Sequence, residues 1–326
     1  MSHSFLRESK LYIVYGVNRY RIYTSSAITF NQTFAEESYS VKTLHDQSKM
    51  FEGSIINKAN PASFSFDVPL TKEKEESIVL TLASDLVSTS ESDIEIQQLK
   101  SFDIYVQTRS STFKLEGAVI TSASFDFIPT NQFTMRVEGE GKKLTRAGDE
   151  DLTIPGNGVS GSNYTTPPPA NLPYPELKGR TRTPLIVYPT ITLNDGTSRN
   201  MNNILSVNLN IQNEMEWTPF ETLHDSLNNN TMFPSAHTVG KRIISGEIRQ
   251  YQQGNNAEQF ENFSTNTNLT ITAKNVSGDA DFFKIQINPA MYTARVNPEE
   301  IYTQSYDFRS SDNTGTVNAS ITNYIN

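Results

Sequence analysis

Strict alternation of apolar and polar residues marks several short stretches of the chain. Residues 63–68 place Phe64, Phe66 and Val68 on one face and polar residues on the other, which is the period of a strand with one buried face. An apolar stretch over 11–15, a turn at Gly16-Val17-Asn18 and the same period over 19–23 predict a hairpin over 11–23. Similar patterns predict strands over 27–31, 102–106, 113–120, 121–128 and 133–139.

One helix is predicted between these strands, from a cap at Thr71 to about Leu86. Ile78, Leu82 and Leu86 recur at a spacing of four residues, while charged residues fill the first turns. A single amphipathic helix in a chain rich in strands is expected to lie against a sheet.

The alternation lapses in a polar stretch, residues 44–62, with few apolar residues. We predict a long loop here, and because such loops are uncommon inside compact domains, a functional one. A second loop is predicted over 223–240.

A four-residue motif occurs twice and indicates a tandem duplication. Thr43-Leu44-His45-Asp46 returns 179 residues later as Thr222-Leu223-His224-Asp225. At the same offset residues 28–31 match 207–210 and the turn 16–18 matches 195–197, and at one residue more 64–68 match 244–248. One β-rich unit present twice explains these matches together and favours quasi-symmetric assembly.

The duplication divides the chain into two predicted domains. Gly-rich and then Pro-rich sequence over 150–181 is typical of a linker, which leaves domains over 1–149 and 182–326. In the second domain we expect a weak helix over 257–263 and strands over 269–273 and 283–288. Residues 302–326 have the composition of an exposed strand end or arm.

Composition excludes several classes of function. The chain has no cysteine, hence no disulfide or thiolate chemistry. Its net charge of −9 comes without a basic cluster, so it is not built to grip nucleic acid. The first residues pass directly into polar sequence and no apolar run is long enough to span a membrane, so we expect a soluble, cytoplasmically made chain without membrane insertion.

No group of residues predicts an active site. The His-Asp pairs at 45–46 and 224–225 could belong to a metal or acid–base site, but neighbouring residues on a strand point to opposite faces and no further ligands repeat beside them. Gly139-Glu140-Gly141-Lys142 lacks the spacing of a phosphate loop. Asp126, Glu138 and Glu140 are interpreted as a solvated strand face rather than a glycosidase pair, and Trp217 as a packing anchor rather than a sugar platform. We therefore predict neither enzyme activity nor a cofactor or metal.

The order of these elements resembles that of bacteriophage tail tube proteins. A leading hairpin, a Thr/Asn-rich strand, a long polar loop, an alternating strand, one helix and the closing strand 133–141 carry the resemblance. Two such units joined by a linker resemble the siphophage subtype whose rings are trimers. The resemblance implies a mainly β fold of two tandem tail-tube-like domains, each a sandwich or sheet flanked by one helix, that assemble into a closed multi-subunit β-barrel.

The implied function is that of a structural virion protein. Stacked trimeric, pseudo-hexameric rings would form the hollow tail tube through which double-stranded DNA is ejected, assembled in the bacterial cytoplasm. Implied partners are the chain itself and the tape measure, distal or baseplate, and terminator proteins. Geometry agrees, because about 24 strands about 4.8 Å apart and tilted near 40° close a circle roughly 45–50 Å across, with an opening near 35–40 Å.

Two sets of residues are candidates for this function. The long loops are expected to reach the neighbouring ring through Leu44, His45, Asp46, Phe51, Ile55, Ile56, Leu223, His224, Asp225, Met232 and Phe233. A polar, net acidic lumen is expected to contain Thr29, Asn31, Asn208, Asn210, Thr134, Arg136, Glu138 and Glu140.

Two alternatives remain open at this point. One is another ring of a phage tail, such as a distal tail or baseplate-hub component, and the other is a β-sandwich that binds carbohydrate or a host receptor.

Overall fold

The computed structural model describes most of both halves of the chain. The described residues are 9–42, 50–70, 74–84, 86–91, 94–108, 111–128, 131–148, 154, 157–158, 188–194, 198–218, 233–252, 268–274, 283–287, 289–310 and 319–323. Within these ranges the protein is mainly antiparallel β with one short helix, and no described helix is long and apolar enough to cross a membrane.

The first half contains most of the described elements. In chain order they are β1 (Lys10–Tyr15), β2 (Asn18–Ile22), β3 (Thr29–Asn31), β4 (Phe34–Lys42), β5 (Met50–Ala59), β6 (Ala62–Pro69), α1 (Lys74–Ser84), β7 (Leu86–Glu91), β8 (Ile94–Leu99), β9 (Phe102–Gln107), β10 (Ser111–Phe127), β11 (Thr134–Gly141), β12 (Lys143–Gly148) and β13 (Asn157–Gly158).

The described elements of the second half are all strands. They are β14 (Tyr188–Asn194), β15 (Ser198–Asn200), β16 (Ile204–Thr218), β17 (Ala236–Tyr251), β18 (Asn268–Lys274), β19 (Phe283–Ile287), β20 (Pro289–Asn297), β21 (Thr303–Ser310) and β22 (Ala319–Asn323).

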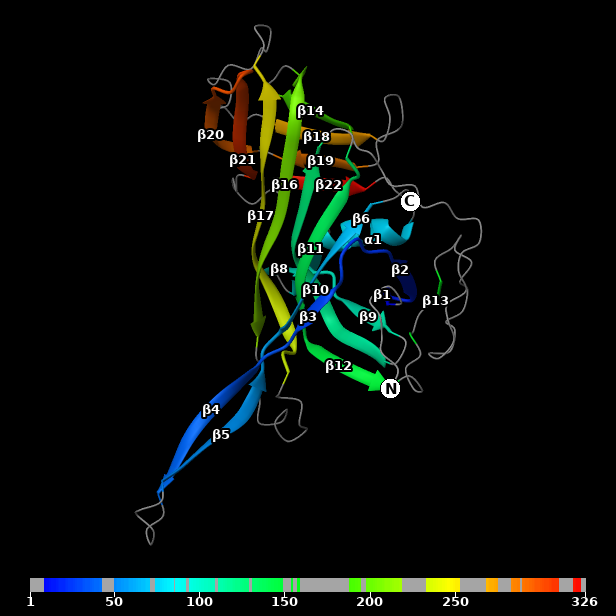
Figure 1. Ribbon diagram of the computed structural model, residues 1–326, viewed down its shortest axis with the longest axis vertical. Helices are drawn as coiled ribbons and strands as arrows, with labels where there is room; N and C mark the ends of the chain where they lie inside the picture. Colours follow the sequence, from blue (N-terminus) through cyan, green and yellow to red (C-terminus); the bar gives the residue numbers. More distant parts are fainter. Residues whose placement is uncertain are drawn as a thin grey trace.

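A long antiparallel sheet passes through both halves of the molecule. Its strands lie in the order β3-β6-β11-β10-β16-β17-β21-β20, and the pairing of β10 with β16 joins the two halves edge to edge. Figure 1 shows β10, β11, β16 and β17 running side by side along the long axis. The sheet does not close on itself: β3 and β20 are its two edges among the described residues.

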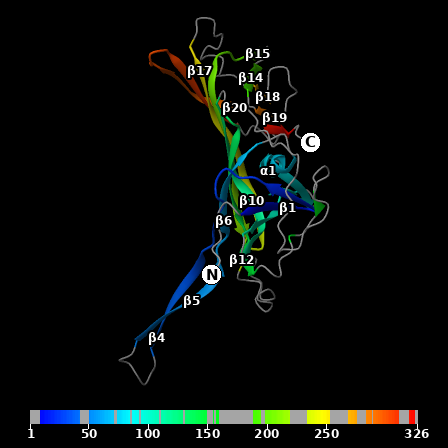
Figure 2. The same cartoon turned by 45° about the vertical axis from the view of Figure 1, so that its right-hand side comes forward.

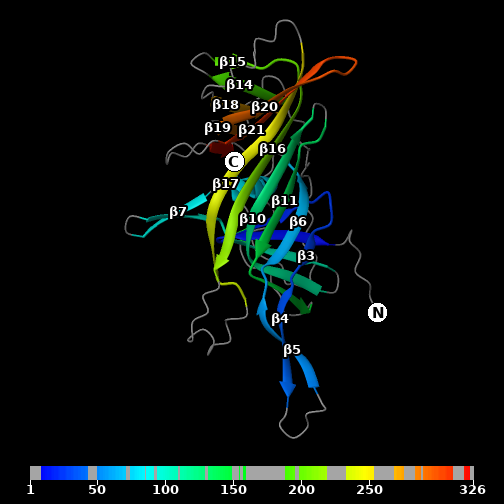
Figure 3. The same ribbon diagram turned by 90° about the vertical axis from the view of Figure 1, so that its left-hand side faces the viewer.

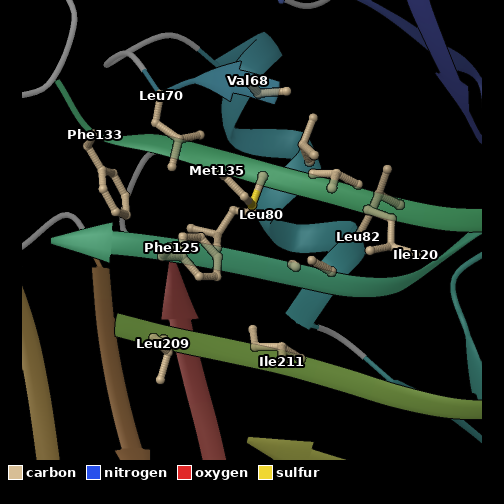
Figure 4. Packing of buried hydrophobic residues seen from close by; sticks show 14 of the residues in the cluster. Val68, Leu70, Leu80, Leu82, Ile120, Phe125, Phe133, Met135, Leu209 and Ile211 are labelled. Carbon is tan, nitrogen blue, oxygen red and sulfur yellow. The ribbon is translucent and has the colours of Figure 1, made fainter. Parts of the chain in front are cut away.

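One face of this sheet forms the core because its apolar residues alternate with polar ones. The fully buried side chains on that face include Phe66, Val137, Phe125, Leu209 and Phe308. Helix α1 packs against the same face, and its Leu80 and Leu82 lie behind β10 and β11 (Figure 4). At about 1.5–3 kcal/mol for each large apolar side chain removed from water, this packing is the main stabilisation of the fold.

Each half also carries a second sheet. In the first half the order is β13-β2-β1-β9-β10-β12, with β13 parallel to β2, and in the second half it is β15-β14-β18-β19-β22. Strand β10 belongs to both sheets of its half, and it bends between Leu115 and Ala118, where the register shifts. Gly117 adopts φ +58° at this bend, a conformation that costs glycine little and other residues more.

Strand order is therefore the same in the two halves. The four strands β3-β6-β11-β10 correspond to β16-β17-β21-β20, and β2-β1-β9-β10-β12 correspond strand for strand to β15-β14-β18-β19-β22. When Ser65 and Ser245 are taken as equivalent, the pairing makes Thr29 equivalent to Asn210, an offset of 181 residues. The sequence match of 179 residues at this strand is thus two residues out of register, an error that leaves every side chain on its predicted face.

Most predicted elements of the first half are confirmed. The hairpin is β1–β2, residues 63–68 lie in β6, and the helix spans 74–84 with Ile78 and Leu82 buried. Leu86 is not part of the helix, because it begins β7. The strands predicted over 113–120 and 121–128 are one continuous strand, β10.

Three predictions, the two long loops and the exposed strand end or arm, are wrong in part. Residues 50–59 of the predicted first loop form β5, which pairs along its length with β4, and residues 236–240 of the second form the start of β17. The predicted arm over 302–326 contains β21, in which Tyr306 and Phe308 are fully buried. These errors arose where strict alternation of apolar and polar residues is short or absent, because pairing with a distant strand can order a segment with little periodicity of its own.

Several predicted features lie outside the described residues. They are both copies of the Thr-Leu-His-Asp motif, with Leu44, His45, Asp46, Leu223, His224 and Asp225, together with Met232, most of the linker and the predicted helix over 257–263.

Candidate functional site

The outer face of the long sheet is mainly polar along its eight strands. The register places Thr29 beside Ser65, Ser65 beside Glu138, and Glu138 beside Ser122. Beyond the joint between the halves, Ser124 pairs with Asn210, which pairs with Ser245. We call this surface the polar wall. All eight predicted lumen residues lie on it: Thr29, Asn31, Thr134, Arg136, Glu138, Glu140, Asn208 and Asn210.

Side chains on the polar wall contact one another between strands. Thr29 and Ser65 share a hydrogen bond of 2.7 Å between hydroxyls, and the Asn208 amide donates to Asp126 Oδ1 at 2.6 Å. The second of these bonds lies across the joint of β10 and β16. Within β11, Arg136 pairs with Glu138 at 3.1 Å, an exposed pair that contributes little stability.

Charge on the polar wall is net acidic among the described side chains. Its carboxylates outnumber its guanidiniums, and Glu138, Glu214 and Asp126 are exposed. The carboxylates are Asp67, Asp126, Glu138, Glu140, Glu214, Glu247 and Asp307, and the guanidiniums are Arg136, Arg249, Arg295 and Arg309. Two of these arginines are also paired, Arg249 with Glu299 and Arg295 with Asp307. The wall therefore offers few cations to a polyanion.

Sequence reasoning found only part of this surface. It identified β11 and the ends of β3 and β16, where alternation is strict, and interpreted Asp126 correctly as part of a solvated strand face. It missed Asp67, Glu247 and Arg309. The signal for Asp67 was available, because it lies between the buried Phe66 and Val68, and Glu247 occupies the matched position beside the buried Ile248. Arg309 lies in β21, within the segment that was predicted as an exposed strand end or arm.

Trp217 is a packing residue, as predicted. Its indole Nε1 donates to Glu140 Oε2 at 2.7 Å, and its ring lies 5.4 Å from that of His237. Because the Trp217 indole is half-buried and makes these two contacts, it does not present an open face on which a sugar could stack. Burial lowers the pKa of His237 below its usual value, against a hydrogen bond to the backbone of Leu99 that raises it, so this imidazole is neutral at physiological pH.

No metal site is found in the part of the chain that the structure describes. No three His, Asp or Glu side chains come together there. The phosphate-loop-like residues 139–142 lie at the end of β11 and the turn into β12, with no helix after them. Gly139 instead serves packing, because a Cβ there would lie 2.4 Å from the ring of Phe64.

The hairpin of β4 and β5 projects from the body of the molecule. Figures 2 and 3 show it extending beyond the long sheet, away from α1. Near its base, Phe34 and Ile56 are 46% and 57% exposed, while Ala59 is buried. Phe51 and Ile55 occupy β5 opposite Val41 and Glu37, and Phe233 lies just before β17. Apolar groups exposed on a projecting element are typical of a surface that contacts a partner.

Comparison with known proteins is consistent with surfaces that contact partner proteins. The bacteriophage baseplate tube protein family matches residues 1–146 and 176–326, which is nearly the whole chain. No curated protein matches it. The match favours a baseplate ring, left open above as an alternative, over the main tail tube. The chain belongs to the bacteriophage baseplate tube protein family and is a non-enzymatic structural protein of the phage tail and baseplate.

Proposed function

We propose that the chain forms a closed ring in the baseplate segment of the phage tube, with the polar wall facing the channel through which the genome passes. The observation that carries this proposal is the long sheet, which has one buried face, one polar and net acidic face and, within the described part of the chain, two unpaired edges. Unpaired sheet edges present backbone groups that can pair with another chain.

The size of the sheet favours three chains in the ring. Eight strands from each of three chains make 24, which at about 4.8 Å spacing and a tilt near 40° close a circle roughly 48 Å across. Two chains would leave an opening of roughly 20 Å after side chains, too tight for a hydrated duplex, whereas three leave about 38 Å. The corresponding strand order of the two halves supplies six similar units around such a ring.

An acidic channel wall favours passage of the DNA without binding to it. Repulsion between exposed charges acts within roughly 8 Å at physiological salt, a distance similar to the gap between a central duplex and the wall. Because binding to DNA depends on cations that displace its counterions, a wall poor in free cations holds the duplex weakly wherever it touches.

The same proposal assigns the remaining parts of the chain. Two tail-tube-like domains, 1–149 and 182–326, are joined by a linker over 150–181. The β4–β5 hairpin and residues 223–240 contact the neighbouring ring, whose protein is another copy or an adjoining tail component. The tape measure, distal or baseplate, and terminator proteins are the expected neighbours along the tail axis.

Mass and shape of the purified protein test the ring. Native mass spectrometry is expected to find trimers, and negative-stain images are expected to show rings with a central channel. Because a baseplate ring can require a neighbour to form, the measurement is repeated with the adjoining tail proteins co-expressed. Monomers under both conditions, or a ring with the polar wall on its outside, would overturn the proposal.

A further inference from the structure

We propose that β20 of one chain pairs antiparallel with β3 of the next copy, in the register that β10 and β16 adopt inside the chain. This inference rests on the ring proposed above. It adds which edges meet, in which direction and at which residues. The partner surface is a second copy of this chain, and the template for the contact is the joint between the two halves of the molecule.

The template follows from the strand order. Strand β10 is the last strand of the first half's four-stranded group, and β16 is the first strand of the second half's group. The equivalent of β10 in the second half is β20, and the equivalent of β16 in the first half is β3. The internal joint is therefore a last strand paired with a first strand. The two free edges are one of each kind.

The register can be transferred residue by residue. Phe125 and Ser124 pair with Met135 and Arg136 in β11, while Ala294 and Thr293 pair with Tyr306 and Asp307 in β21. With Ser65 equivalent to Ser245, these pairings make Thr293 equivalent to Ser124 and Ala294 equivalent to Phe125.

The partner strand is transferred in the same way. Thr29 is equivalent to Asn210, and Ile28 to Leu209. Ser124 pairs with Asn210 across the internal joint, and Phe125 pairs with Leu209. The inferred contact therefore sets Thr293 opposite Thr29 of the next chain, and Ala294 opposite its Ile28.

Burial distinguishes the joined edges from the free ones. At the internal joint the core-side residues Phe125, Phe127, Leu209 and Ile211 are at most 1% exposed. Their equivalents at the free edges are not covered: Val296, the equivalent of Phe127, is 41% exposed. Ala294 is exposed, and Ile28 and Phe30 are only half-buried. Pairing of β20 with β3 would remove this apolar surface from water, which is favourable.

The direction of the contact determines whether the copies form a ring or a two-fold dimer. Two β20 edges that paired with each other would form a two-fold dimer and leave both β3 edges open. A last strand that pairs with a first strand is a head-to-tail contact, which is repeated by every copy until the ring closes. The curvature of the sheet then sets the number of copies.

Disulfide cross-linking tests the register, and the absence of native cysteine keeps the background low. The test variant is T293C with T29C, whose residues are opposed in the inferred register. Opposed residues have Cα atoms about 4.5–5.5 Å apart, within disulfide reach. The positive control is S124C with N210C, the equivalent pair inside one chain. The register control is T293C with N31C, which are diagonal and about 7–8 Å apart.

Oxidation of assembled T293C/T29C protein is expected to shift the chain from monomer to covalent trimer on a non-reducing gel. The S124C/N210C pair is expected to close within the monomer, as shown by peptide mapping, and T293C/N31C to remain monomeric on the gel. Melting temperatures near that of the wild type establish that each variant is folded.

The outcomes separate this inference from the proposed function. Rings that form by mass while T293C/T29C fails to link, or while T293C/N31C links instead, would overturn the inferred contact and leave the ring standing. A trimeric mass whose chains link through two β20 edges would do the same. Protein that stays monomeric even with its tail neighbours present would overturn both.

Discussion

At the scale of single residues, two glycines allow large rings to lie flat against the long sheet. A Cβ on Gly139 would lie 2.4 Å from the ring of Phe64, and one on Gly246 would lie 2.7 Å from the ring of Phe308. Each glycine is directly opposite its phenylalanine in the register. The same packing device thus occurs once in each half, on equivalent pairs of strands, β6 with β11 and β17 with β21.

Gly246→Ala is expected to destabilise the fold. Its Cβ would lie 2.1 Å from the carbonyl oxygen of Asn208 as well as against Phe308, and overpacking of this kind costs about 1–3 kcal/mol. The control is Gly240→Ala in the same strand, where the nearest atom is 3.9 Å away. Urea unfolding should show a lower midpoint for Gly246→Ala only; equal midpoints for both variants would contradict the close packing.

At the scale of elements, the β4–β5 hairpin stands apart from the core. Its two strands pair with each other rather than with the long sheet. The body of the protein therefore does not need the hairpin for its own packing. In the proposed assembly, this projecting pair of strands, with Phe34 and Ile56 exposed, would contact a neighbouring ring.

Replacement of residues 36–57 by a short Asn-Gly turn, which joins the paired residues Ala35 and Lys58, is expected to leave a folded protein that still forms rings but does not stack. Asn-Gly is a preferred two-residue connection between paired antiparallel strands. Thermal unfolding should remain close to that of the wild type, because few core contacts are lost. Electron microscopy of assemblies measures stacking, and the T293C/T29C cross-link reports ring formation in the same variant. Normal stacks would show that the hairpin is not the axial contact.

At the scale of the whole molecule, the proposed function depends on the sign of charge over the polar wall rather than on one site. Glu138 and Glu214 are exposed, and they belong to different halves of the chain. The described wall carries more carboxylates than guanidiniums. Three copies would multiply this excess around the channel.

Reversal of two wall charges, Glu138→Lys with Glu214→Lys, is expected to slow genome release while rings still assemble. New cations on the wall bind phosphate by counterion release, so the defect should ease at higher salt. Dye fluorescence of DNA released from virions carrying the variant measures the rate. The control, Glu116→Lys with Glu300→Lys, makes the same change in net charge away from the wall; an equal defect in the control would contradict a role for the wall.

Alternation of residues by itself determined which face of each strand is buried. Phe64, Phe66 and Val68 lie on the core face as predicted, and Thr134, Arg136 and Glu138 on the opposite face, because the side-chain period of a strand is a local property. The duplication was also visible locally, even though its offset at β3 and β16 was two residues short. The mainly β class and the polar wall in outline therefore followed from the sequence.

Tertiary structure alone decided which strands pair. Asp126 and Asn208 are 82 residues apart and meet because β10 joins β16, and β10 serves two sheets because it bends at Gly117. Segments with little alternation, such as β5, became strands because a partner strand supplied their hydrogen bonds. Pairing over long separations depends on loop closure and on the packing of the whole core, so no local pattern could determine the continuous eight-stranded sheet and its two open edges.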